Sequence, residues 1–501
     1  MARRPTHRDK LVAQAGSAHG RKAADKPRTA AKRPRAAGKS ERQKHGSTRI
    51  ALQVLPASPV IEGRALSQKG QTENAVTHSR EAKPVIKYPE TAFQPWPARM
   101  LAGLRKTAAG MAENQSAARA LQFLSILVLA GSTVFWALLS AQIHRMNADQ
   151  YIDAYLFESW ETFQGAVFPG THSFLLKWPL FALMALFGNT DSVFLVATVS
   201  VAFVTVLGFA WLLYLLNRQP LVHAWLCLAL ATVLLLVPIE PYGGALLPTN
   251  FGMTTTRNIE YLLLLVSVVC LLRAKQWRSP WLVAGMTSGV LLIATDKLFL
   301  PLLLGGVGFS VIVHFLQRRT VPLKSIRILA GAAMTVILGS LLLTLLNAVD
   351  ITNISRDTAS SPFQVTESLT GAANAVIYAV LGLLTNFGAN PVHDVIVTGE
   401  LPSAFIQRLL RLETFVYLAH LAVLAAGIWA AFRSVRSGDQ TVAARFAVVL
   451  VGALLTALAI FVATDHYYPV DARYLTIGLF AVFVCLAVCL RRPRASGAYV
   501  G

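Results

Sequence analysis

LQFLSILVLAGSTVFWALLSAQ, residues Leu121–Gln142, is the stretch that decides the fold. It contains no Asp, Glu, Lys or Arg, and as a helix it is long enough to cross a hydrocarbon core of roughly 30 Å. The rest of the chain has the same character, because 54% of its 501 residues are hydrophobic and only 14% are charged. This composition excludes an ordinary soluble globule and predicts an all-α polytopic membrane protein.

Outward from this span, the chain holds eleven further apolar runs that are candidate helices. They are residues 174–188, 192–216, 221–239, 259–272, 281–295, 298–316, 328–347, 371–388, 412–432, 443–464 and 474–490. Together with the first span they predict a helical bundle of about 10–12 transmembrane helices.

Charge in the short loops indicates which of these runs cross. If the runs 174–188 and 371–388 dip or lie at the surface, only Arg257, Lys297 and Arg356 of this region lie outside. Letting both runs cross would instead place eight cations of this region outside and only these three inside. We therefore favour ten crossings, with 174–188 as a juxtamembrane helix of the first external loop. The cations then placed inside are Arg218, Arg273, Lys275, Arg278, Arg318, Arg319, Lys324 and Arg327.

The charge distribution also predicts the domain organisation. Residues 1–118 carry 23 Lys and Arg against 8 Asp and Glu without an apolar period, so we expect a disordered basic cytoplasmic tail. A nucleic-acid-binding arm is the alternative, but a basic flank before a membrane span suits anionic lipid headgroups, and no specific nucleic acid is expected. Residues 119–490 form the predicted transmembrane domain, and 491–501 a short cytoplasmic C-terminal tail. The predicted location is a plasma membrane, the inner membrane of a bacterium, with both termini cytoplasmic.

The first external loop concentrates charged and aromatic residues of the kinds that transfer protons or bind a substrate. It reads DQYIDAYLFESWETFQGAVFPGTHSFLLKWP over residues 149–179. A carboxylate there can take a proton from an attacking hydroxyl, and an ammonium can hold a phosphate oxyanion. Asp149 and Lys177 are the pair we select, and the alternative is that they are ordinary loop charges. The other carboxylates of the loop are Asp153, Glu158 and Glu161.

The remaining external loops carry further ionisable and aromatic residues, although ionisable groups at membrane depth are costly and are usually kept for a pathway or a reaction. An interfacial aromatic belt is the alternative for the tyrosines of the final loop. These candidates are Arg257 and Glu260, the neighbours Asp296 and Lys297, and, in TDHYYPVDAR, His466, Tyr467, Tyr468 and Arg473.

The order of these motifs resembles membrane glycosyltransferases of the GT-C class, in the branch of protein O-mannosyltransferases and the lipid A aminoarabinose transferase. In that branch a catalytic Asp opens the first loop, and a Lys-Pro-Pro-Leu motif follows about thirty residues on, before an apolar stretch ending in Phe-Gly. This chain has Asp149, then KWPL from Lys177, then FG at 187–188. TTTRNIEYLLLL and MTSGVLLIATDKLFLPLLLG resemble the next external loop and hairpin. Gln150 and Trp178 depart from the pattern, and the arginine expected after Phe-Gly is missing.

The resemblance implies a GT-C-like fold and transfer of a sugar from a polyprenyl-phosphate donor to a lipid, glycan or protein acceptor on the external, periplasmic face. Asp149 would be the base, and Glu260 would orient the acceptor or a metal ion. A divalent cation is compatible with the class but is not required by it, and the metal ligands are unknown. The candidate donor-binding residues are Lys177, Arg257, Lys297, Arg473, His466 and Tyr467.

Two other classes remain open from the sequence. A polysaccharide polymerase or ligase would share large external loops and polyprenyl substrates. A transporter or flippase of lipid or sugar would also be polytopic, but it tends to show internal repeats and ionisable groups near the bilayer midplane. No convincing repeat is present in this chain.

Overall fold

The structure, a computed structural model, describes residues 114–143, 157–158, 174–235, 257–348, 365–366, 368–389, 413–464 and 470–491. All of them lie within one of two compact units, residues Pro89–Gly501. Their regular structure is helical, apart from one isolated β-bridge between Val365 and Thr464. The expected disordered tail and the expected C-terminal tail lie almost wholly outside the described residues, so both stay predictions.

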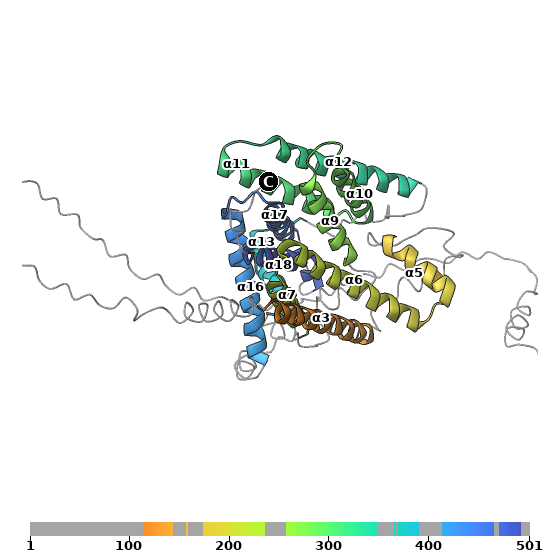
Figure 1. Cartoon of the computed structure of the whole chain (residues 1–501). Coiled ribbons are helices and arrows are strands. Elements are labelled where there is room, and N and C mark those ends of the chain that lie inside the picture. The colour runs from red at the N-terminus through yellow and green to blue at the C-terminus, as the bar shows by residue number, and fades with distance from the viewer. Residues whose placement is uncertain are drawn as a thin grey trace, which may run out of the picture. The chain divides into compact units, whose positions relative to one another are not determined.

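Each predicted apolar run coincides with a helix of the structure (Figure 1). The first begins six residues before the predicted span, at Gln115 rather than Leu121. The helices are α3 (Gln115–Ile143), α5 (Phe174–Phe187), α6 (Asp191–Asn217), α7 (Pro220–Leu235), α9 (Ile259–Arg273), α10 (Pro280–Thr295), α11 (Phe299–Arg318), α12 (Leu323–Ala348), α13 (Leu369–Asn386), α16 (Glu413–Arg436), α17 (Val442–Ala463), the 3₁₀ helix η2 (Val470–Leu475) and α18 (Ile477–Cys489).

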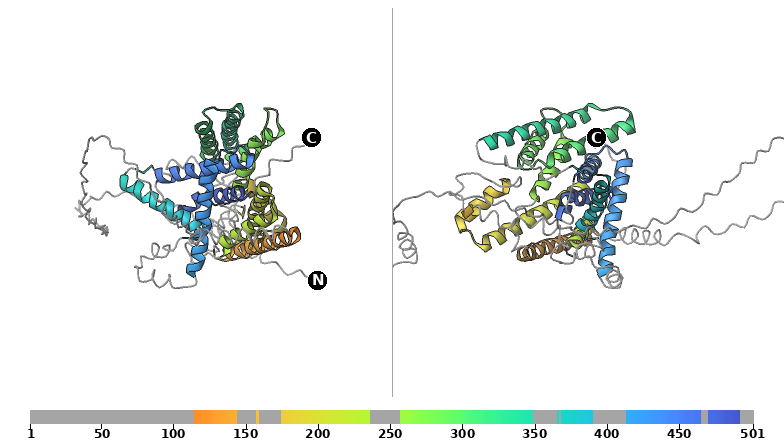
Figure 2. Two further views of the ribbon diagram at one scale, coloured as in Figure 1. Left: turned by 60° about the vertical axis from the view of Figure 1, so that its left-hand side comes forward. Right: turned by 180° about the vertical axis from the view of Figure 1, so that it is seen from behind.

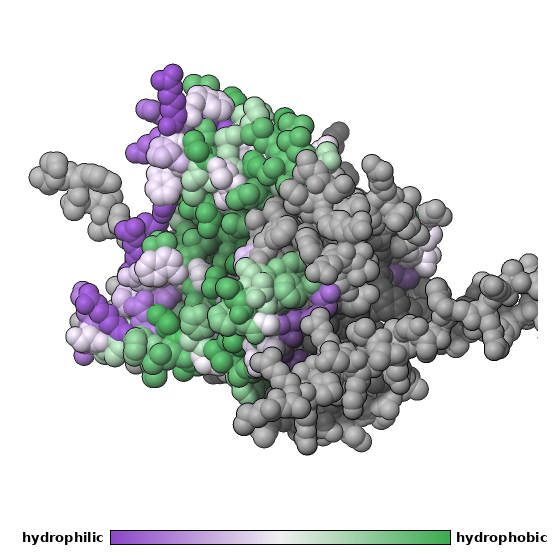
Figure 3. All heavy atoms as spheres, turned by 90° about the vertical axis from the view of Figure 1, so that its right-hand side faces the viewer, coloured by the Kyte–Doolittle hydropathy of each residue, from purple (hydrophilic) through white to green (hydrophobic). Residues whose placement is uncertain are grey.

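The protein is an all-α polytopic membrane protein. Within the described residues, α3, α6, α11, α12, α13, α16 and α17 are long and apolar enough to cross a bilayer, and α7, α10 and α18 are shorter apolar helices. Large apolar side chains such as Trp211, Leu323 and Leu345 are exposed on the outside of the bundle. Figure 3 shows this apolar surface on one face, with most hydrophilic side chains gathered along one side. Lipid tails are the solvent that such a surface requires.

One end of the bundle collects the cations of the short loops, and we call it the basic end. Arg218, after α6, and Arg273, at the end of α9, line the same cavity as Arg491, after α18. Arg327 of α12 donates a hydrogen bond to the carbonyl oxygen of Lys275. The contacts therefore place together several cations that the loop-charge argument assigns to one side, although which side of a membrane they face stays a prediction.

We call the opposite end of the bundle the Asp296 end, after the residue that follows α10. α3 and α7 run in parallel, because Gln122 near the start of one helix lies 2.9 Å from Nδ1 of His223 near the start of the other. Short connections reverse the chain direction from α6 to α7 and from α9 through α10 and α11 to α12. Figure 2 shows α16 steeply inclined to α11 and α12.

α13 has the length and composition of a span, and its contacts show which elements flank it. Just before it, Val365 pairs with Thr464, where α17 finishes at the Asp296 end. Just after it, the carbonyl oxygen of Gly388 lies 3.0 Å from Nδ1 of His420, whose Nε2 lies 3.1 Å from the carbonyl oxygen of Thr232 in the last turn of α7. Both ends of α13 therefore contact residues away from the basic end, and whether this helix crosses a membrane stays a prediction.

α5 packs on the start of α6 through a small cluster of its own. Leu180, Phe181 and Met184 of α5 are buried against Phe194 and Ala197 of α6. The helix has only 14 residues and contains Pro179, which removes a backbone donor and restricts the preceding turn. These features favour the predicted juxtamembrane helix over a crossing.

Small residues let α11 and α17 approach closely, which is the usual way in which membrane helices pack. A Cβ atom at Gly306 would lie 2.6 Å from the carbonyl oxygen of Val449, and one at Gly452 would lie 2.5 Å from Cβ of Phe309. The wider core is apolar and aromatic, with Tyr261 stacked 5.1 Å from Phe480 between ring centroids. This packing holds the start of α9 against η2 and α18.

Candidate anion site at the Asp296 end

The candidate site is built from the start of α9, the end of α10 and η2. Arg257, two residues ahead of α9, donates a hydrogen bond from Nε to Oδ2 of Asp296. Both side chains are nearly enclosed, with exposed fractions of 11% for Arg257 and 3% for Asp296. Burial alone would lower the pKa of the Arg257 guanidinium, but the Asp296 carboxylate raises that pKa above its ordinary value. Arg257 therefore stays a cation in this site.

A backbone hydrogen bond also holds the Asp296 side chain in place. Asp296 follows the last residue of α10, and its Oδ1 accepts a hydrogen bond of 2.8 Å from the backbone N–H of Leu298. A carboxylate with one oxygen on a backbone amide and the other on a guanidinium has a defined orientation. The pair thus joins the α10–α11 turn to the start of α9.

Two guanidinium groups lie against one aromatic ring. The Cζ atom of Arg257 is 5.1 Å from the ring centroid of Tyr474, and that of Arg473 is 5.6 Å from it. Each distance is within the roughly 6 Å range of a cation–π contact. Arg473 of η2 and Arg257, which precedes α9, thus both lie against the Tyr474 ring.

Arg473 differs from Arg257 in its partners. Its Nε atom is buried and has no hydrogen-bond partner among the described residues. Its backbone carbonyl oxygen accepts a 2.7 Å hydrogen bond from the hydroxyl of Thr476, which fixes the turn between η2 and α18. A buried guanidinium nitrogen without an acceptor costs free energy that an anionic ligand could recover. Arg473 is therefore the better placed of the two arginines to hold an anion.

Glu260 lies in the first turn of α9 and is 1% exposed. Its Oε2 accepts a 3.1 Å hydrogen bond from the backbone N–H of Asn258, and Oδ1 of Asn258 accepts one of 2.6 Å from the N–H of Ile259. A carboxylate at this position also interacts favourably with the helix dipole. The structure thus shows Glu260 organising the start of α9, and its proposed role toward an acceptor or metal ion stays a prediction.

The other predicted site residues are placed only in part. Lys297 is exposed beside Asp296 at the same end. Lys177 lies in the first turn of α5, with its side chain outside the described part. Asp149, His466 and Tyr467 lie outside the described residues altogether. The structure therefore brings together Arg257, Glu260 and Arg473 of the predicted set, and leaves the catalytic assignment of Asp149 untested.

Sequence reasoning missed two members of the cluster. Asp296 was noted as the neighbour of Lys297, whereas the structure pairs it with Arg257. Tyr474 was not among the candidate residues, whereas its ring contacts both arginines. The ring follows a candidate arginine directly in DARYL, which is a weak signal that could have drawn attention to it.

The cluster is suited to binding a phosphate rather than a metal ion. Its charged members nearest Tyr474 are two guanidiniums and one carboxylate, and guanidiniums match the geometry of phosphate oxygens. Within the described ranges, no group of three or more His, Cys, Asp or Glu is placed to hold a metal ion. The described residues therefore offer no set of ligands for the divalent cation that the sequence left open.

Comparison with protein-family models, with curated proteins and with solved structures finds no match to this chain. The geometry of the cluster and the order of the sequence motifs are accordingly the basis of the functional argument.

Proposed function

We propose that the protein is a membrane glycosyltransferase that moves a sugar from a polyprenyl-phosphate-linked donor to a hydroxyl acceptor at the Asp296 end. In this reaction the acceptor oxygen forms a bond to the anomeric carbon while the bond from that carbon to the phosphate oxygen breaks. The acceptor proton goes to the base, assigned to Asp149, and polyprenyl phosphate leaves. Cations near the phosphate stabilise the charge that develops on the leaving oxygen.

The observation that carries this proposal is the pair of arginines on the Tyr474 ring. Arg257 is neutralised by Asp296, and Arg473 has a buried Nε without a described acceptor. Among the described residues Arg473 has no ion pair, so its guanidinium is the group that a phosphate anion would contact. The exposed Lys297 adds a further cation at the same end. The resemblance of the motifs to GT-C enzymes supports the choice of a sugar phosphate over other anions.

The test uses the full-length protein in nanodiscs and polyprenyl phosphate as the probe, because it carries the phosphate of the donor whatever the sugar is. Arg473→Gln removes the charge that the proposal places on the phosphate. We expect its affinity for polyprenyl phosphate to fall roughly tenfold, since a charge-assisted hydrogen bond contributes about 1.5–3 kcal/mol. Transfer from a panel of polyprenyl-phosphate hexoses and pentoses is expected to fall at least as far.

Arg433→Gln is the matched control. The Arg433 guanidinium also lies over an aromatic ring, 5.3 Å from the centroid of Trp429, but in the last turn of α16 at the basic end. The two variants change the net charge equally and each removes one cation–π contact. If Arg473→Gln binds polyprenyl phosphate as tightly as Arg433→Gln, or if no panel donor is transferred by the wild type, the proposal is wrong.

A further inference from the structure

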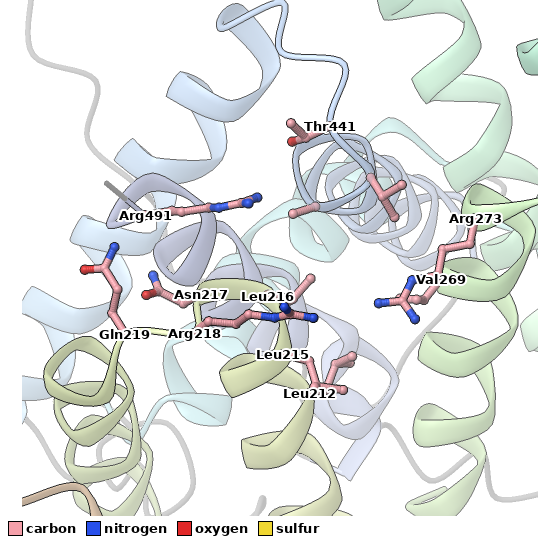
Figure 4. A pocket seen from close by; sticks show the side chains of 12 residues that line it. Leu212, Leu215, Leu216, Asn217, Arg218, Gln219, Val269, Arg273, Thr441 and Arg491 are labelled. Atoms are coloured by element: carbon pink, nitrogen blue, oxygen red, sulfur yellow. The ribbon is translucent and has the colours of Figure 1, made fainter. Parts of the chain in front are cut away.

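The basic end holds a second site of different construction. A cavity of about 620 Å³ lies between the ends of α6, α9 and α18 and the start of α17 (Figure 4). It is separate from the Tyr474 cluster, because Arg257 and Arg273 flank opposite ends of α9, whose 15 residues span roughly 22 Å. Its volume is within the range of about 300–1,000 Å³ that is typical of small-molecule sites.

Three arginines from three elements surround the cavity. Arg218 follows α6, Arg273 ends α9 and Arg491 follows α18. Figure 4 shows Arg218 and Arg273 extending toward one another from opposite sides, with Arg491 reaching in beside them. No Asp or Glu lines the cavity within the described residues. Like charges that converge in this way repel one another, so an anion between them would be stabilising.

These cations have few partners of their own. In the described part of the chain, neither the Arg218 nor the Arg491 side chain has a hydrogen bond or an ion pair, and Arg273 lies over the ring of Trp281 at 5.1 Å. The nearby carboxylate of Asp439 is occupied by Thr441, from whose N–H and hydroxyl it accepts hydrogen bonds of 2.9 and 3.0 Å. The three charges thus remain directed at the cavity.

A buried amide on the same wall fixes two of the three arginine-bearing elements to one another. Asn217 is 4% exposed and lines the cavity, and its amide nitrogen donates a 2.6 Å hydrogen bond to the carbonyl oxygen of Ala487. Its Oδ1 is buried and has no partner among the described residues. The hydrogen bond to Ala487 joins the end of α6 to the end of α18, the two elements that carry Arg218 and Arg491.

The rest of the lining is largely apolar. Leu212, Leu215 and Leu216 come from the last turns of α6, and Val269 comes from α9. A ligand with a phosphate and an apolar or carbon-rich portion would therefore place its phosphate at the arginines and its carbon atoms against the leucines. A site that holds only inorganic ions would not need the leucines.

We propose that this cavity binds a phosphate ester, with its phosphate between Arg218, Arg273 and Arg491 and its carbon portion against the leucines of α6. Two sources have this chemistry: the headgroup of an anionic phospholipid, and a soluble phosphate ester from the aqueous phase at the basic end. The site would act from the end of the bundle opposite to the Tyr474 cluster, so it stands independently of glycosyl transfer.

The experiment separates the two sources with full-length protein in nanodiscs of neutral phosphatidylcholine. In one arm phosphatidylglycerol is added to the bilayer, and lipid retained on the released protein is counted by native mass spectrometry. In the other arm glycerol 3-phosphate is titrated in solution, and binding is followed by the rise in Tm. Saturable binding in the first arm assigns a lipid ligand, and saturable binding in the second assigns a soluble ester.

Arg218→Gln is the test variant, and Arg319→Gln is its matched control. Both arginines are exposed, follow the last residue of a helix in a left-handed conformation, with φ of 58° and 57°, and belong to the basic end, but only Arg218 lines the cavity. We expect roughly tenfold weaker binding for Arg218→Gln in the arm that responds, and wild-type binding for Arg319→Gln.

A second variant guards against a purely local folding effect. Leu215→Trp keeps every charge but fills part of the cavity, and we expect it also to weaken binding by about tenfold or more while the Tm without ligand stays near that of the wild type. The proposal is overturned if neither arm shows saturable binding to the wild type, or if Arg218→Gln and Leu215→Trp bind as well as Arg319→Gln.

Discussion

Arg257 and Asp296 form a buried ion pair between two elements 39 residues apart in the chain, the approach to α9 and the exit of α10. The pair lies beside the ring of Tyr474, so it also determines how much positive charge the cluster presents. A buried pair of this kind is costly to break, because removing one partner leaves an uncompensated charge.

The first prediction concerns this pair. We expect Asp296→Asn to lower the free energy of unfolding by about 3–5 kcal/mol, and the double variant Arg257→Met/Asp296→Leu to be more stable than Asp296→Asn, since an apolar pair of similar volume leaves no buried charge. The measurement is reversible unfolding in mixed detergent micelles. Asp191→Asn, at an exposed position in the first turn of α6, is the control and is expected to cost under about 1 kcal/mol. Equal losses in Asp296→Asn and the control would contradict the buried-pair argument.

The second prediction concerns the base. Asp149→Asn keeps the side-chain size and removes the proton-accepting charge, so we expect turnover to fall by roughly 10²-fold or more. Binding of polyprenyl phosphate is expected to persist, because the phosphate contacts are assigned to other residues. The readout is product formation and binding on the same monodisperse preparation.

Glu158→Gln is the control for the base, because it changes a carboxylate of the same loop. Glu158 accepts a 3.0 Å hydrogen bond from the side chain of Asn189, and the glutamine oxygen can still accept it. Turnover of this variant is expected to remain near the wild-type value. Near-normal transfer by Asp149→Asn would move the assignment of the base to Asp153 or Glu260.

The third prediction concerns topology. Gln276 and Lys297 are exposed at opposite ends of the α9–α10 pair. If the basic end is cytoplasmic, a membrane-impermeant thiol reagent applied to intact cells will label Lys297→Cys but not Gln276→Cys. Wild-type protein gives the background, which we expect to be low because Cys227, Cys270 and Cys485 are buried. Labelling of Gln276→Cys alone would invert the predicted orientation.

The fourth prediction concerns the contact of α11 with α17. Gly306→Ala places a Cβ atom 2.6 Å from a backbone carbonyl oxygen, so we expect a loss of about 1–3 kcal/mol of unfolding free energy. Gly308→Ala, two residues on, meets nothing within 4 Å and is expected to cause no loss. The comparison of the two alanines by thermal unfolding separates crowding from helix propensity. A Gly306→Ala protein as stable as Gly308→Ala would show that the helices pack less closely than the structure has them.

The positions of the helices were predictable from the sequence alone. A segment within lipid must satisfy its own backbone hydrogen bonds and must be long and apolar enough to span, so runs such as 192–216 and 443–464 indicate helices without knowledge of their neighbours. The grouping of loop cations was predictable for a related reason, since Lys and Arg in short loops favour one side. The contact of Arg327 with Lys275 agrees with that grouping.

Tertiary structure alone decided which polar residues meet and which elements the ends of α13 contact. Hydropathy gives α13 the length and composition of a span, and only the structure shows that the residues flanking it contact Thr464 and His420. Asp296 stands next to Lys297 in the sequence but pairs with Arg257, because the packing of α9 on α10 brings their ends together. Arg473 reaches the same place from near the end of the chain. Apolar periodicity reports the environment of a segment, whereas a site depends on the distances between segments, and those distances are determined by packing.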